Sequence, residues 1–120
     1  MLRSVSAVVG GYVVFAVSAV LLFQLSGRDP HAAAPIAFMA AATIWGAVFA
    51  MVGGWLAAHV SVRRPSVHAA SVAALIAIGA TASILTASGA IWSQVSALLV
   101  MAPCAWLGGV LAARQQGRPY

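Results

Sequence analysis

The stretch from Val67 to Ala113 contains no Asp, Glu, Lys or Arg, and it limits the possible folds more than any other part of the sequence. About 20 apolar residues cross the hydrocarbon core of a bilayer, so this stretch is too long for one crossing and about right for two. Small polar residues and Gly interrupt it between Thr86 and Gln94, where we expect a turn. The stretch therefore predicts two spans, at about 68–86 and 93–113.

Two further apolar stretches precede it, at about 5–25 and 36–59. The first could also be a secretory signal peptide, but the apolar core of such a peptide is about 7–15 residues long, so we expect a retained span. Charged residues make up 6% of the chain, compared with about 25% in soluble domains. The sequence predicts an all-α, polytopic membrane protein, with residues 1–120 forming one domain of four transmembrane helices.

The charged residues predict the topology. All the basic residues are Arg, and Asp29 is the one acid, which gives a net charge of +5. The arginines form no run, so we expect no nucleic-acid partner. In a four-span chain, one side would carry Arg3, Arg63, Arg64, Arg114 and Arg118. Because basic loops stay in the cytoplasm, this pattern favours a bacterial inner-membrane protein with both termini cytoplasmic, and the five arginines are candidate contacts for lipid headgroups.

The second predicted span carries a stripe of small residues, because every fourth position is Ala or Gly: Ala42, Gly46, Ala50, Gly54 and Ala58. These positions share one face of a helix, which lets another backbone approach closely. Ala105, Gly109 and Ala113 repeat the spacing in the fourth span. We expect helix–helix contacts at these residues, although such spacing also arises by chance in an Ala-rich chain.

The same two spans also share a sequence repeat. Residues 53–58 read Gly-Gly-Trp-Leu-Ala-Ala and residues 108–113 read Gly-Gly-Val-Leu-Ala-Ala, and each copy is followed by an Arg-Pro pair. Both spans would run in the same direction across the membrane. The repeat therefore predicts two similar parallel hairpins in a pseudo-symmetric four-helix bundle.

The first copy, followed by Arg63-Arg64-Pro65, together with the second Leu-Gly-Gly from Leu107, resembles small bacterial four-helix membrane proteins that have no assigned function. The resemblance covers about half the chain. It implies a four-helix membrane fold and carries over no activity and no catalytic residue.

His59 and His68 flank one predicted loop and are candidate haem or metal ligands, because a neutral imidazole ligates both. No carboxylate is expected on that side, so polar residues at helix ends are the preferred interpretation, and we expect no cofactor. Cys104 is alone and can form no disulfide within the chain. Hydroxyl side chains within the spans could line a polar path or bond to their own helix backbone; they are Thr43, Thr81, Ser83 and Ser96.

No acid lies within a span, so the sequence does not favour an enzyme or a proton-coupled carrier. Small multidrug exporters need a Glu in the first span, and fluoride channels need pore elements that have no counterpart near Thr81. We expect an accessory or assembly subunit that packs against other membrane subunits or against itself in contact with lipid. The alternative is an oligomeric permease or channel for a neutral or apolar solute.

Overall fold

The computed structural model describes residues 1–86 and 89–119, and these residues contain helices and no strands. The helices are α1 (Leu2–Ser26), α2 (Ile36–Val60), α3 (Pro65–Thr86), α4 (Trp92–Ser96), the π-helix η1 (Ala97–Met101) and α5 (Ala102–Gln115). The last three are continuous and form a fourth span, Trp92–Gln115. All four spans are long and apolar enough to cross a membrane, which confirms the predicted all-α, multi-pass membrane fold. Ala87 and Ser88 of the predicted third turn lie outside the described residues.

The helix ends follow from local backbone chemistry. After α1, Gly27 adopts φ 70°, a left-handed conformation that costs glycine little, and the amides of Gly27 and Arg28 donate to the carbonyls of Gln24 and Phe23. Helix α3 begins with Pro65, three residues before the predicted boundary, because proline fits the first helical turn, where its missing N–H has no intrahelical acceptor.

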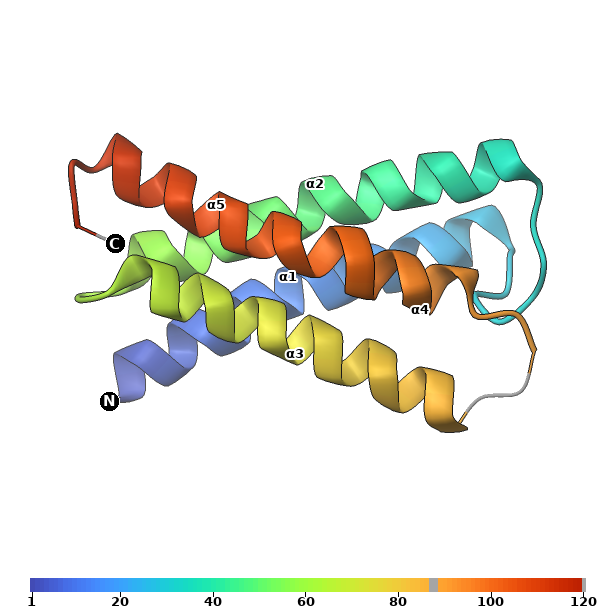
Figure 1. Ribbon diagram of the computed structural model, residues 1–120, viewed down its shortest axis with the longest axis horizontal. Helices are drawn as coiled ribbons and strands as arrows, with labels where there is room; N and C mark the ends of the chain where they lie inside the picture. The colour runs from blue at the N-terminus through green and yellow to red at the C-terminus, as the bar shows by residue number, and fades with distance from the viewer. Residues whose placement is uncertain (87–88, 120) are drawn as a thin grey trace.

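The helices form an elongated bundle of 42 × 26 × 22 Å, a length that matches a bilayer with its headgroups at about 40–45 Å. Figure 1 shows both termini and the α2–α3 turn at one end of the bundle, and the other two turns at the opposite end. We call these the terminal end and the far end. Exposed apolar side chains cover the long sides of the bundle, as lipid contact requires. On α1, for example, Val5, Val9, Val13 and Val17 are exposed.

Near the terminal end the helices pack backbone to backbone. Helix α2 is central and contacts α1, α3 and α5. Gly11 of α1 faces Gly53 of α2 so closely that a Cβ on either one would overlap the carbonyl oxygen of the other. Gly54 makes an equally close approach to the carbonyl of Ala105 in α5. In lipid such packing replaces the hydrophobic effect as the source of helix association, so this half of the bundle is tightly closed.

Toward the far end, large aromatic side chains separate the helices. There the side chains of α1 and the fourth span meet through rings such as Phe23 and Trp92, whose centroids are 6.1 Å apart. Phe38 of α2 packs edge-on to both of these rings, with centroid distances of 6.2 and 6.0 Å. The bundle is therefore wider in this half.

The π-helix η1 lies in this wider half and ends at Met101, two residues before Pro103. Proline has no N–H to donate to the carbonyl four residues earlier, and its ring crowds that carbonyl, so the preceding turn widens. The widened turn carries Met101, which is buried and lies against Gly46 of α2. Cys104, on the next turn, is half-buried against the core.

Candidate functional site

The small-residue stripes lie inside the bundle. All the predicted positions are buried: Ala42, Gly46, Ala50, Gly54 and Ala58 on α2, and Ala105, Gly109 and Ala113 on α5. A Cβ added at Gly109 would overlap the side chain of Ala69 in α3. Contacts within the chain therefore occupy both stripes, and they are not available to a partner helix in this fold.

The two copies of the sequence repeat use their glycines differently. In α2, Gly53 faces α1 and Gly54 faces α5, whereas in α5, Gly108 faces α2 and Gly109 faces α3. The contact with the preceding span is thus made by the first glycine of the pair in α2, toward α1, and by the second glycine in α5, toward α3. Because the copies are not in equivalent positions, the two-hairpin symmetry stays a prediction.

Two of the five predicted headgroup arginines complete the C-terminus of α2. Arg3 Nε donates to the carbonyl of Val60 at 2.8 Å, and Arg118 Nη1 donates to the carbonyl of Ala58 at 3.1 Å. The last carbonyls of a helix lack intrahelical donors and carry partial negative charge, so both guanidinium groups are favourably placed. The others also lie at the terminal end, Arg63 and Arg64 in the α2–α3 turn and Arg114 in the last turn of α5.

His59 is held by its neighbours in a way that does not favour metal or haem ligation. Its ring stacks on Trp55 with the centroids 4.7 Å apart, and its Nδ1 lies 2.9 Å from Gln116 Nε2. Arg118 donates to Gln116 Oε1 at 2.9 Å, so the amide must present its NH₂ group to the imidazole. Nδ1 therefore accepts, and the proton of the neutral ring is on Nε2. Neither ring nitrogen of His59 then has a free lone pair for a ligand bond.

His68 has a separate local role. Its Nδ1 lies 3.0 Å from the carbonyl oxygen of Arg64, one turn earlier, so Nδ1 carries the proton and donates. Within residues 1–86 and 89–119, no three His, Cys, Asp or Glu side chains group together as metal ligands would. Of the two histidines, His68 keeps a free ring lone pair, on Nε2, and the described residues place no cluster of metal ligands around it.

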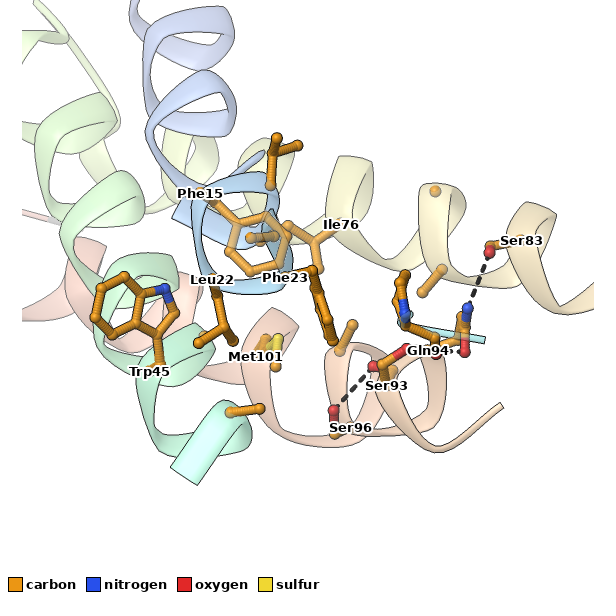
Figure 2. Close-up of a pocket in the computed structure, with 18 of the residues that line it drawn as sticks. Phe15, Leu22, Phe23, Trp45, Ile76, Ser83, Ser93, Gln94, Ser96 and Met101 are labelled. Carbon is orange, nitrogen blue, oxygen red and sulfur yellow. Dashed lines mark hydrogen bonds between the residues drawn. The ribbon is translucent and has the colours of Figure 1, made fainter. Parts of the chain in front are cut away.

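The clearest candidate site is a cavity of about 440 Å³ in the wide half of the bundle. All four spans line it, and on α1 it extends from Tyr12 to Gln24, about 18 Å at the helical rise. Figure 2 shows its apolar side, where Phe15, Leu22, Trp45 and Met101 gather, and its polar side, where Ser83, Ser93, Gln94 and Ser96 lie. The volume is within the range of small-molecule pockets, about 300–1,000 Å³.

Gln94 organises the polar side. It is 6% exposed, and its Nε2 lies 2.8 Å from His31 Nδ1 and 3.2 Å from Ser83 Oγ. The hydroxyl of Ser93 lies 3.0 Å from Gln94 Oε1 and 2.8 Å from the carbonyl of Pro30. The Ser93 hydroxyl has one proton and can donate to only one of these two oxygens at a time. The other oxygen can therefore accept a hydrogen bond from a ligand.

Two further hydroxyl groups line the cavity with bonding capacity to spare. The Tyr12 hydroxyl has no hydrogen-bond partner in the described part of the chain, and Ser83 accepts from Gln94 while its own proton has no acceptor there. Of the other predicted path residues, Thr43 bonds to the carbonyl of Met39 in its own helix, and Thr81 is exposed and does not line the cavity. Ser96 lines the cavity and bonds to the carbonyl of Ser93.

Sequence reasoning places Gln94 and His31 in turns and so misses their contact. They are 63 residues apart, and the far-end turns bring them together: the Ala90 amide donates to the His31 carbonyl at 2.8 Å, and the Trp92 indole donates to the Ala32 carbonyl at 2.8 Å. A polar amide at the start of an apolar span is the one local signal that pointed to this cluster.

No family model matches the chain, and neither the curated proteins nor the solved structures contain a significant match to it. The functional interpretation therefore rests on the geometry of the chain itself.

Proposed function

We propose that this membrane protein binds a neutral amphipathic molecule in the far-end cavity, as the binding step of a small carrier or permease. The observation that carries the proposal is the cavity itself, which all four spans line and which has one apolar and one polar side. An amphipathic ligand would lay its hydrocarbon part against the Phe15, Trp45 and Met101 side and its polar end against Gln94 and Ser83.

The lining chemistry favours a ligand without charge. None of the described lining residues is Asp, Glu, Lys or Arg, so an ion would lose its hydration without gaining a counter-charge. The Tyr12 and Ser83 hydroxyl groups can each donate one hydrogen bond to a ligand oxygen. A long-chain alcohol, ester or ketone meets these conditions, and a fatty-acid anion or an alkylammonium ion does not.

The closed half of the bundle argues for a carrier rather than an open channel in a single chain. Between the cavity and the terminal end, the Gly11–Gly53 and Gly54–Ala105 contacts bring the helix backbones together. A solute could pass this region only if these contacts separated or if an oligomer provided another route.

The same proposal places the protein in the bacterial inner membrane with its termini in the cytoplasm. Its support is the position of five arginines at the terminal end, where the negative surface of the cytoplasmic leaflet and the positive-inside rule favour basic residues. The cavity would then lie in the half of the bundle that faces the outer leaflet.

The second candidate is an accessory subunit or homo-oligomer that works through helix–helix contacts. It would have to use lipid-facing side chains, since the small-residue stripes are buried within the chain. The row formed by Val5, Val9, Val13 and Val17 on α1 is the surface that favours it, because these exposed side chains repeat every four residues on one helix face.

Quenching of tryptophan fluorescence tests the ligand proposal. Trp45 and Trp92 line the cavity, and Trp55 and Trp106 do not, so a Trp55→Phe/Trp106→Phe background isolates the relevant signal. In nanodiscs, a brominated fatty alcohol should quench this signal with a saturable component. The brominated fatty-acid anion should quench it weakly, because no cation in the described lining balances its charge.

A blocking variant and a matched control make the test specific. Ala80 is buried and lines the cavity, whereas Ala74 on the same helix is exposed. Ala80→Phe should abolish saturable quenching, and Ala74→Phe should leave it unchanged. Quenching that never saturates, or that is equal in both variants, would show simple partitioning into the bilayer and would reject the cavity as a binding site.

A further inference from the structure

The terminal end carries an excess of positive charge that the fold only partly uses. Arg3 and Arg118 bond to α2 carbonyls, whereas Arg63 and Arg64 project from the exposed α2–α3 turn and bond to no other side chain in the described residues. The one acid of the chain, Asp29, lies in the first turn at the far end, where its carboxylate accepts from the His31 amide at 2.8 Å. Arg63 and Arg64 therefore have no Asp or Glu partner among the described residues.

An apolar groove borders this turn. It lies between α1 and α3, has a volume of about 430 Å³, and is lined mainly by Val5, Val8 and Val9 on α1 and by Val67, His68 and Ser71 on α3. Val67 and His68 are in the first turn of α3, three and four residues after Arg64, and both of their amides donate to the Arg64 carbonyl. The groove therefore runs from the arginine turn along the surface that faces hydrocarbon.

We propose that this groove and the Arg63–Arg64 turn together bind one anionic phospholipid of the leaflet that faces the terminal end. The lipid phosphate pairs with the two guanidinium groups, and one acyl chain lies in the valine-lined groove. A guanidinium presents paired N–H donors that match phosphate oxygens, and a span end lies at the depth of the headgroups. A zwitterionic lipid brings its own cation and gains less from the two arginines, so the site selects net negative lipids.

Lipid binding measured by native mass spectrometry tests this site without reference to the far-end cavity. The protein is released from nanodiscs that contain equal amounts of phosphatidylglycerol and phosphatidylcholine. The wild type should retain phosphatidylglycerol preferentially. Each surface arginine strengthens binding of an anionic lipid about fivefold, so Arg63→Gln/Arg64→Gln should weaken retention on the order of thirtyfold.

Three matched variants separate the site from general charge and from folding. Arg28→Gln removes a positive charge at the far end and should retain the preference, and Arg63→Lys/Arg64→Lys should restore most of it. Val9→Trp fills the groove and should lower lipid retention although every arginine is present. Inorganic phosphate should not displace the lipid, because it gains nothing from the groove.

The proposal is overturned if the wild type shows no preference for phosphatidylglycerol. It is equally overturned if Arg28→Gln reduces retention as much as the double variant, since net charge alone would then explain the effect. Unchanged lipid retention in Val9→Trp would remove the groove from the site.

Discussion

Three glycine-to-alanine substitutions at different positions test whether the terminal half is held by backbone contact. Alanine favours a helix over glycine by about 1 kcal/mol, so the substitution stabilises the chain wherever a Cβ has room. At Gly10 no atom lies within 4 Å of an added Cβ, at Gly46 the neighbour is the flexible Met101 side chain, and at Gly54 it is the Ala105 backbone. The added methyl group therefore meets open space at Gly10, a movable side chain at Gly46 and a fixed backbone at Gly54.

The free energy of unfolding should follow that order. Gly10→Ala should be neutral or stabilising by up to about 1 kcal/mol. Overpacking costs about 1–3 kcal/mol, and at Gly54 the helices α2 and α5 must move apart, so Gly54→Ala should lose up to about 2 kcal/mol net of the propensity gain. Gly46→Ala should fall between the two, because the Met101 side chain can change rotamer.

Reversible unfolding in mixed detergent and SDS micelles, followed by circular dichroism, measures these differences. Each variant carries the same type of substitution, Gly to Ala. The effect of detergent on the free energy of unfolding is therefore common to all three and cancels when they are compared. Equal stabilities for Gly10→Ala and Gly54→Ala would refute the close contact between α2 and α5. A larger loss at Gly46 than at Gly54 would refute the distinction between side-chain and backbone neighbours.

Two further predictions concern the fourth span and the terminal end. Pro103→Ala should restore a regular α-helix through residues 97–101, because residue 103 regains its N–H, and it should turn Met101 away from Gly46. Loss of saturable quenching by the brominated alcohol measures the effect on the cavity. Unchanged quenching would mean that η1 does not shape the cavity. Arg118→Gln should lower the free energy of unfolding by about 1 kcal/mol through loss of its bond to the Ala58 carbonyl, whereas Arg63→Gln, in the exposed α2–α3 turn, is the control, and equal losses would contradict the capping role.

The membrane fold could be predicted from the sequence because its determinants are local. Length and hydropathy set the spans, and the proline and glycine residues at their ends, such as Gly27 and Pro65, set the boundaries to within a few residues. The stripe through Gly54 was visible because small residues recur every four positions. Which helix each glycine contacts was not visible, since Gly53 and Gly54 face opposite neighbours although they are adjacent in sequence.

The cavity could not be predicted because it depends on how whole helices are arranged. It forms where aromatic side chains from three spans separate backbones that meet closely elsewhere, and its polar side joins His31, Ser83 and Gln94 from three segments. Spacing along one helix carries no information about such a set. Pro103 is a local signal for the widened turn, because a proline inside a helix removes one backbone hydrogen bond.

The most direct test of the proposed function is native mass spectrometry of the protein extracted gently from its own membranes. We predict a single chain or a homo-oligomer that carries a small neutral molecule, retained by Ala74→Phe and lost from Ala80→Phe. The opposite result is a complex with unlike protein chains and no small molecule, or a bound molecule that both variants retain equally. Either would contradict the cavity as the working site, and the former would favour the accessory-subunit hypothesis.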